Sequence, residues 1–218
     1  MALLVAAVLL TGVVAVYIVN QDDEVEEVAP PPPPPPDEPG YWLVDAQGGV
    51  FASGAAQSAG DRAGEPLAAP IVDIAATPDG DGYWLAAADG GVFAYGNATA
   101  FPPPAPLPLG APVVAVVATP TGDGYWLASA DGGVFAVGDA QFFGGRAGEP
   151  LAGPVVDIAV TPDGDGYWLA AADGGVFAYG DADAFPPAVQ PGESASPIVA
   201  MVAAAIPAQV DAPVHDGT

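Results

Sequence analysis

The chain of 218 residues contains no cysteine, one histidine and only two basic side chains, Arg62 and Arg146. The absence of cysteine excludes disulfides, thiolate nucleophiles and cysteine-ligated metal ions. There are 27 acidic residues against these two basic ones, which gives a net charge of −25. Because proteins that bind nucleic acids place basic side chains along the phosphates, the composition predicts that nucleic acid is not a partner.

Catalytic motifs are equally scarce. The single histidine, His215, lies in residues 208–218, which we expect to be a disordered tail. The sequence has no G-x-S-x-G motif and no glycine-rich phosphate loop between a strand and a helix. We therefore predict a protein that is not an enzyme and has no catalytic residues. A glycoside hydrolase or lyase that uses paired carboxylates is the alternative.

The acidity has two competing explanations. The charges are scattered through a chain that is 51% apolar, which is not the composition of a disordered protein. One explanation is halophilic adaptation, because salt screens the repulsion between like charges, and the other is cation binding by the carboxylates. We favour halophilic adaptation.

Residues 2–19 form an uncharged run that is interrupted only by Thr11 and Gly12. A helix of this length spans about 27 Å, close to the roughly 30 Å hydrocarbon core of a bilayer. We expect residues 1–20 to be an uncleaved transmembrane anchor; a cleaved signal peptide and a buried core helix are the alternatives. No basic residues flank the run to orient it, and we expect the domain on the extracellular side of the cell membrane.

Residues 21–39 indicate a spacer, because an acidic run is followed by the prolines of residues 30–36. Seven prolines in succession form a stiff polyproline II rod of about 22 Å. A docking site for a proline-recognising domain is the alternative.

The rest of the chain is a repeat. The tripeptide GYW begins at Gly40, Gly82, Gly124 and Gly166, so consecutive copies are equally spaced. Each copy is followed by a GGVF block and then by a block such as PIVDIAATP or PVVAVVATP. The repeat therefore divides the chain into the units 40–81, 82–123, 124–165 and 166–207.

The three blocks of each unit have the features of strands. They are short, rich in Val, Tyr, Trp and Phe, and bounded by Asp-Gly turns, while 29 Gly and 27 Pro disfavour helix. The strands are apolar on both faces, so each sheet must be covered on both sides. Stacked propeller blades achieve this with about 40–45 residues each, a length that the units match.

We therefore predict an all-β fold, a four-bladed β-propeller. Its first unit starts at GYWL and its last ends with an apolar block at residues 197–207, so strands from both ends of the chain complete one blade. A parallel β-solenoid, an open array and closure by oligomerisation are the alternatives.

The pattern GDGYWL-x-x-x-DGGVFA-x-GDA-x-F-x-G, closed by PVVDIA-x-TP, resembles a repeat of exported and cell-surface proteins of actinobacteria. The resemblance covers residues 40 to about 207. It departs at residues 44–49, VDAQGG, and in the proline-rich insertions of the second and fourth units. The resemblance implies a propeller-like array at the cell surface, with no established activity of its own.

The units alternate. The first and third carry RAGEPLA at Arg62 and Arg146, and the second and fourth carry AFPP at Phe101 and Phe185. The true period is therefore two units, and the identical twenty-residue stretches 77–96 and 161–180 are separated by this same period. The period predicts pseudo-twofold symmetry produced by duplication of a two-unit block.

Six residues are candidates for ligand binding. Each arginine has two interpretations, an ion pair with Glu65 or Glu149 that fixes a loop, or a guanidinium offered to an anionic ligand. Aromatic side chains beside the proline loops would form a shallow groove for a sugar or a peptide, which is our preferred site. Its members are Tyr95, Phe101, Tyr179 and Phe185.

The acidic turns offer the pairs Asp79 with Asp81 and Asp163 with Asp165. Their oxygens suit Ca²⁺, but PDGDG lacks the spacing of a twelve-residue calcium loop, and Asp-Gly is ordinary turn chemistry. We predict no metal or other cofactor, with Ca²⁺ as the weaker hypothesis. The sequence thus predicts a non-catalytic binding module for an envelope polysaccharide or a surface protein; a purely structural repeat protein is a further alternative.

Overall fold

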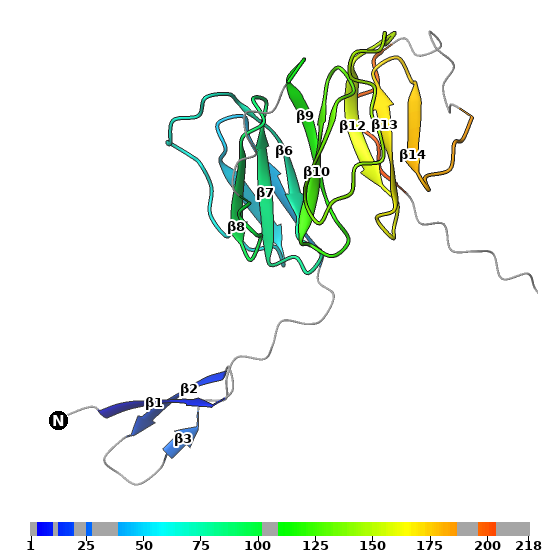
Figure 1. The fold of residues 1–218 in the computed structure, drawn as a ribbon. Coiled ribbons are helices and arrows are strands. Elements are labelled where there is room, and N and C mark those ends of the chain that lie inside the picture. Colours follow the sequence, from blue (N-terminus) through cyan, green and yellow to red (C-terminus); the bar gives the residue numbers. More distant parts are fainter. Residues whose placement is uncertain are drawn as a thin grey trace, which may run out of the picture. The chain divides into compact units, whose positions relative to one another are not determined.

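The computed structural model describes residues 4–10, 13–19, 25–27, 39–101, 109–186 and 196–203. The chain separates into two compact units, Met1–Pro39 and Gly40–Thr218 (Figure 1). The polyproline run at residues 30–36 and the tail at residues 208–218 lie outside the described residues.

The first unit contains strands where the sequence predicted a helix. Strands β1 (Leu4–Leu10), β2 (Val13–Val19) and β3 (Val25–Glu27) form an antiparallel sheet in the order β1-β2-β3, with Leu10 opposite Val13. The difference has a physical basis, because the β-branched valines of both segments favour strands. No helix in the described part of the chain is long and apolar enough to cross a membrane.

The second unit confirms the prediction of an all-β repeat. Every described sheet is antiparallel, with three sheets of three strands and one of two strands in the orders β6-β7-β8, β9-β10-β11, β12-β13-β14 and β4-β5. The strands are β4 (Gly40–Val44), β5 (Val50–Gly54), β6 (Ile71–Ala76), β7 (Gly82–Ala87), β8 (Val92–Gly96), β9 (Val113–Ala118), β10 (Gly124–Ser129), β11 (Val134–Gly138), β12 (Val155–Val160), β13 (Gly166–Ala171) and β14 (Val176–Gly180). We call β6, β9 and β12 the inner strands, and β4, β7, β10 and β13, which carry GYWL or GYWLA, the middle strands.

The turn between an inner and a middle strand is built from the TPDGDG segment. The Thr77 backbone N–H donates to the Gly82 carbonyl at 2.9 Å, and the Gly82 N–H donates to the Thr77 hydroxyl at 3.0 Å. Gly80 has a φ of +76°, a conformation that side chains with a Cβ rarely adopt. Thr119 and Thr161 hold the equivalent positions in the next two sheets, where each N–H also donates to the carbonyl five residues on.

Consecutive sheets are joined by tryptophan–tyrosine contacts. Tyr and Trp are adjacent in each middle strand and so point to opposite faces of the sheet. The ring centroids lie 5.6 Å apart for Trp42–Tyr83, 5.7 Å for Trp84–Tyr125 and 6.0 Å for Trp126–Tyr167. The sheets β6-β7-β8 and β9-β10-β11 therefore each contribute a tryptophan to one junction and a tyrosine to the previous one.

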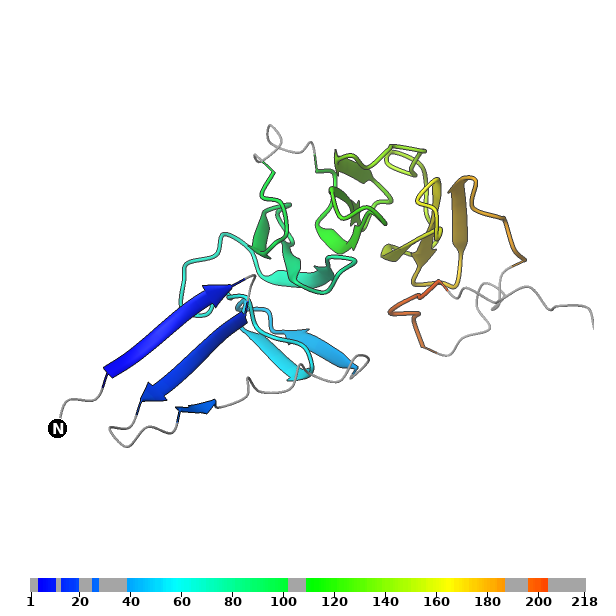
Figure 2. The ribbon, with the colours of Figure 1, turned by 90° about the horizontal axis from the view of Figure 1, so that it is seen from below.

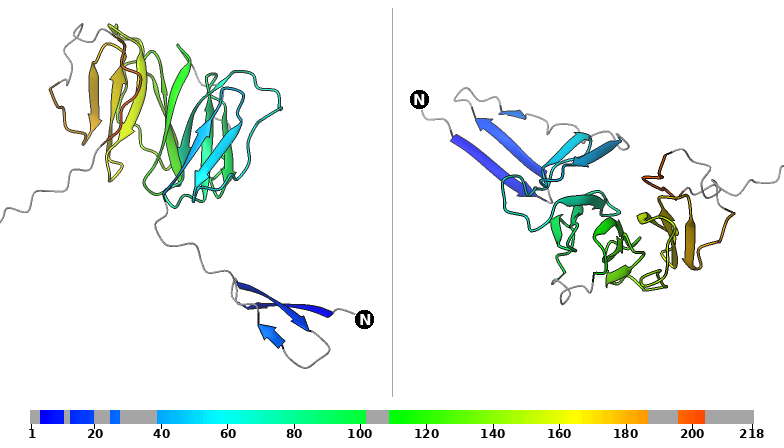
Figure 3. Two further views of the ribbon diagram at one scale, coloured as in Figure 1. Left: turned by 180° about the vertical axis from the view of Figure 1, so that it is seen from behind. Right: turned by 90° about the horizontal axis from the view of Figure 1, so that it is seen from above.

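The sheets follow one another along an arc, which is clearest in Figures 2 and 3. The hairpin β4–β5 lies at one end, and the segment Pro197–Ala203 lies beside the last sheet at the other, where the Ile198 N–H donates to the Ala172 carbonyl at 2.9 Å. No hydrogen bond between described residues joins this segment to β4. The structure thus shows repeated blade-like sheets, and it does not show the closed ring that the sequence predicted.

Candidate functional site

Two aspartates connect the inner strands of neighbouring sheets. The Asp73 carboxylate accepts the N–H of Ile74 through Oδ1 and the N–H of Val116 through Oδ2, both at 2.8 Å. The Asp157 carboxylate does the same for Ile158 at 2.8 Å and Met201 at 2.6 Å. A bulge precedes each aspartate in its strand, and a bulge leaves backbone groups without a partner in the ladder. Asp73 therefore satisfies N–H groups on the inner strands β6 and β9, and Asp157 satisfies N–H groups on β12 and on the segment Pro197–Ala203.

The surroundings of Asp73 disfavour its charge. Burial raises the pKa of this carboxyl to about 6 from the usual 3.8, and the Asp157 carboxylate adds to the increase, while the two backbone N–H donors act in the opposite direction. This pair of aspartates was not predicted from the sequence. The available signal was an aspartate within the otherwise apolar PIVDIA and PVVDIA blocks.

The inner strands line an apolar cavity of about 750 Å³. Three equivalent turn prolines lie at its margin, and the hydroxyls of Thr119 and Thr161, which also line it, donate to the carbonyls of Gly124 and Gly166. The cavity therefore offers apolar surface and few free polar groups, as ligand sites commonly do. The prolines are Pro78, Pro120 and Pro162.

The prolines that line this cavity belong to turns rich in aspartate. Each marginal proline belongs to a turn that also carries one or two exposed aspartates. The Thr77 hydroxyl donates to Asp79 at 2.7 Å, and this hydrogen bond is the main reason that the pKa of Asp79 is lowered. The turn carboxylates, which include the predicted weak metal ligands, are Asp79, Asp81, Asp123, Asp163 and Asp165.

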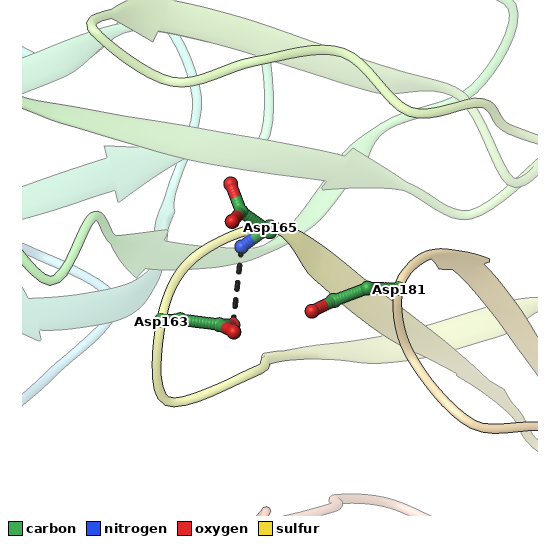
Figure 4. Close-up of side chains that lie close together, drawn as sticks. All are labelled: Asp163, Asp165 and Asp181. Carbon is green, nitrogen blue, oxygen red and sulfur yellow. Dashed lines mark hydrogen bonds between the residues drawn. The ribbon is translucent and has the colours of Figure 1, made fainter.

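One of these turns brings three carboxylates together. Oxygens of Asp163, Asp165 and Asp181 lie within 4.8 Å of one another (Figure 4), and the Asp165 N–H donates to Asp163 Oδ1 at 3.3 Å. Asp181, which follows β14, was not among the predicted ligands. Partial desolvation and the neighbouring Asp163 carboxylate raise the pKa of Asp181. Three carboxylates in this arrangement could hold a cation such as Ca²⁺.

We call the group of Asp163, Asp165 and Asp181 the all-aspartate corner. At the equivalent corners of the sheets β6-β7-β8 and β9-β10-β11, a hydrogen-bond donor replaces one of the three carboxylates. Asn97 occupies the position of Asp181 in one sheet and donates to Asp79 at 2.6 Å. In the other sheet Thr121 occupies the position of Asp163 and donates to Asp139 at 2.5 Å. The all-aspartate corner therefore has a like-charge contact where its counterparts have a hydrogen bond.

This comparison predicts that Asp181→Asn stabilises the domain. The new amide can donate to Asp163 as Asn97 donates to Asp79, so we expect a rise in the melting temperature of about 1–3 °C in calcium-free buffer. Asp183→Asn, which removes one exposed charge nearby, is the control and should give a smaller rise. If the corner binds Ca²⁺, millimolar CaCl₂ will stabilise the wild type more than Asp181→Asn, and equal effects would exclude the cation.

The two arginines form the ion pairs that the sequence predicted. Arg62 Nη1 lies 2.5 Å from Glu65 Oε2, and Arg146 Nη1 lies 2.9 Å from Glu149 Oε2. Each guanidinium also lies over a phenylalanine ring, at 4.2 Å from the centroid of Phe93 in the first case. The Nε atoms of both arginines are buried and have no hydrogen-bond partner among the described residues. The arginines thus fasten a loop of one unit to the next sheet.

The predicted aromatic groove is distributed over several sheet junctions. The Tyr95 hydroxyl donates to the Asp61 carbonyl at 2.7 Å, and its ring packs 5.7 Å from Tyr83. Gly60, with a φ of +133°, fits against the Tyr95 ring because a Cβ there would lie 2.6 Å from Tyr95 Cδ1. Tyr179 repeats this arrangement two units later, beside Tyr167 and Gly144.

The two phenylalanines lie at other junctions. Phe101 is half-buried against Tyr125, with ring centroids 5.8 Å apart. Phe185 is 69% exposed and stacks on Trp168 at 6.4 Å, beside the cavity. The structure therefore places Arg62 near Tyr95 at one junction and Arg146 near Tyr179 at another, and it does not gather the six predicted residues into one site.

Comparison of the sequence with protein-family models found no matching family, and a search of curated proteins found no similar sequence. The resemblance to the actinobacterial repeat therefore stays a prediction.

Proposed function

We propose that this chain is a non-catalytic binding module of the cell surface, a four-bladed β-propeller displayed on the extracellular side of a membrane. The apolar run of residues 2–19 would attach it to the membrane, although its described parts are strands. The observation that carries the binding function is an apolar cavity of about 750 Å³ lined by the prolines of three turns that also contain exposed aspartates.

The chemistry of this cavity favours a particular partner. Apolar surface at the centre suits an apolar side chain, and the surrounding carboxylates suit basic residues next to it. The net charge of −25 would attract a cationic segment over a longer range and repel an anionic polymer. We therefore propose a partner protein that presents a segment of basic and apolar residues.

An envelope polysaccharide has weaker support as the ligand. Three of the four aromatic residues proposed to bind it, Tyr95, Phe101 and Tyr179, are half-buried and pack at sheet junctions. Sugar-binding aromatics need an open face, and among these four only Phe185 is largely exposed.

Two triple variants that each remove three negative charges test the proposed partner. Asp81→Asn, Asp123→Asn and Asp165→Asn together remove three carboxylates at the cavity margin, and no side-chain hydrogen bond is described for Asp81 or Asp123. Binding to the full chain is measured by fluorescence anisotropy with a labelled peptide of alternating lysine and leucine. We expect the Kd to rise about tenfold at low salt, and less at high salt.

The control triple variant removes the same charge from the turns at the opposite ends of the middle strands: Asp89→Asn, Asp131→Asn and Asp173→Asn. Its Kd should change less than threefold. Equal weakening by both triple variants, or equally tight binding of a glutamate–leucine peptide, would contradict a partner recognised at the cavity margin.

A further inference from the structure

The two ends of the arc are complementary halves of one blade. In each complete sheet an inner strand pairs with a middle strand, as Ile74 pairs with Leu85 and Ile158 with Leu169. The hairpin β4–β5 has a middle strand but no inner strand in its sheet. The segment Pro197–Ala203 begins with the same P-[IV]-V block as the inner strands, and none of its described residues belongs to a sheet.

Hydrogen bonds place this segment in the position of an inner strand. The Ile198 N–H donates to the Ala172 carbonyl at 2.9 Å, as the Val113 N–H does to Ala88 and the Val155 N–H does to Ala130. The Met201 N–H donates to Asp157, in the same way that the Val116 N–H donates to Asp73. The segment therefore occupies the place where the next blade starts.

The exposed side chains at the first end have buried counterparts elsewhere. Tyr41 is 57% exposed and Leu43 is 59% exposed, whereas the equivalent Tyr83 and Leu85 are both fully buried. Each counterpart tyrosine is covered by the preceding sheet, and no described sheet of the second unit precedes β4. The face of β4–β5 that carries Tyr41 thus lacks the cover that the repeat provides at every other junction.

At the other end of the arc, the last sheet lacks a tyrosine contact that the internal junctions have. At two internal junctions a tyrosine packs against both a tryptophan and a phenylalanine: Tyr125 against Trp84 and Phe101, and Tyr167 against Trp126 and Phe143. Trp168 and Phe185 hold the equivalent positions at the end of the arc. They contact each other, and no described tyrosine packs against them.

We infer that the hairpin β4–β5 docks onto the sheet β12-β13-β14 of the same chain, with Tyr41 packed against Trp168 and Phe185. In this arrangement β4 pairs antiparallel with Pro197–Ala203 and completes the fourth blade, and the register of the other sheets places Leu43 opposite Met201. The inference rests on the four-bladed architecture proposed above and names the contacts that close it. Because Trp168, Phe185 and Met201 line one side of the cavity, closure covers that side and leaves the inner strands and the turn prolines as the proposed binding surface.

The partner is the chain's own hairpin and not that of a second copy. Both halves belong to one chain, and tethering gives them an effective concentration on the order of millimolar. A second copy would bring another net charge of −25 to the interface, and this like-charge repulsion disfavours association.

The absence of cysteine allows a direct test. Leu43→Cys combined with Met201→Cys places two thiols on residues that are opposite in the inferred register, where Cβ atoms lie about 4.5–5.5 Å apart and a disulfide needs little adjustment. After mild oxidation of the full chain, we expect an intramolecular disulfide in most molecules, detected by mass spectrometry and by mobility on a non-reducing gel. Leu43→Cys with Phe142→Cys, two positions that are each 59% exposed, is the control and should form at least tenfold less intramolecular disulfide.

Disulfide-linked dimers would assign the hairpin's partner to a second copy and overturn the inference, as would a yield equal to that of the control. Stability provides an independent measurement, because Tyr41→Ala should lower the melting temperature about as much as Tyr83→Ala. No loss for Tyr41→Ala would also overturn it. Peptide binding is measured on the wild type, because Met201 also lines the cavity. Cross-linking of the double-cysteine variant together with no binding of the lysine–leucine peptide by the wild type supports ring closure and contradicts only the proposed binding function.

Discussion

Replacing Trp126 with alanine will lower the free energy of unfolding by about 3–5 kcal/mol, the usual cost of truncating a buried tryptophan. The Trp126 side chain is 1% exposed, its ring packs 6.0 Å from Tyr167 in the next sheet, and its indole N–H donates to the Gln141 carbonyl at 2.7 Å. The substitution therefore removes packing from both sheets and leaves the Gln141 carbonyl without its indole donor. Urea denaturation of the wild type and the variant measures the difference.

Two further variants separate the contributions. Trp126→Phe keeps an aromatic ring at the junction and loses the N–H donor, so we expect a smaller loss of about 1–2 kcal/mol. Phe142→Ala truncates a ring that is 59% exposed, and its effect should stay within about 0.5 kcal/mol. A loss below about 1.5 kcal/mol for Trp126→Ala would show that the tryptophan–tyrosine junction is not the main interaction that holds neighbouring sheets together.

The sheets could be predicted from the sequence because their determinants are local. GYWL, GGVF and the inner-strand blocks are short apolar segments bounded by Asp-Gly turns, and their recurrence at a constant spacing fixes the order of elements. The ion pairs of Arg62 and Arg146 could also be predicted, since each acidic partner lies three residues away. The strands within residues 2–19 could not be predicted from the sequence, because an apolar run of this kind has no periodicity that distinguishes a helix from a strand.

The contacts at the candidate site could not be predicted from the sequence, because they join residues that are far apart in the chain. Asp73 accepts a hydrogen bond from Val116, 43 residues away, and Tyr95 packs on Gly60 of the preceding unit. A repeat pattern indicates that neighbouring sheets touch, but it does not indicate which side chains meet across the junction. For that reason Tyr95 and Tyr179 were predicted to line a groove, whereas the structure places them in packing.

The same contacts explain why the period of the repeat is two units and not one. Asp73 and Asp157 are separated by this period, and Ala115 and Ala200 hold the equivalent positions in the intervening blocks. Since each aspartate accepts N–H groups from its own inner strand and from the equivalent block of the next unit, one aspartate serves two such blocks. If every unit had an aspartate at this position, two carboxylates would compete for the same backbone N–H donors. More charge would also be buried, which is unfavourable. A block of two units is thus the smallest that satisfies these donors with single carboxylates.

The buried carboxyl of Asp73 predicts that the domain loses stability as the pH rises from about 4 to about 6. The pKa of this group is about 6 in the folded protein against 3.8 as the ordinary value. Within this window the folded state therefore binds more protons than the unfolded state, and the stability that protonation provides is complete near pH 4 and lost above pH 6. One unit of pKa corresponds to about 1.4 kcal/mol, so this group contributes at most about 3 kcal/mol. Urea denaturation at a series of pH values measures the change.

Asp73→Asn removes the titrating group and should flatten the dependence of stability on pH between 4 and 6. At pH 4 the protonated carboxyl still offers two oxygens to the N–H groups of Ile74 and Val116, whereas asparagine offers one oxygen and an NH₂ donor, so this variant should also be less stable than the wild type at pH 4. Asp183→Asn, an exposed residue on the loop after β14, controls for the loss of one negative charge from a highly acidic chain. Because general charge repulsion also grows as carboxyl groups ionise, only the difference in slope between Asp73→Asn and this control reports on the buried carboxyl. Equal slopes for the two variants would place the pH dependence in the acidic surface and not at the junction between β6 and β9.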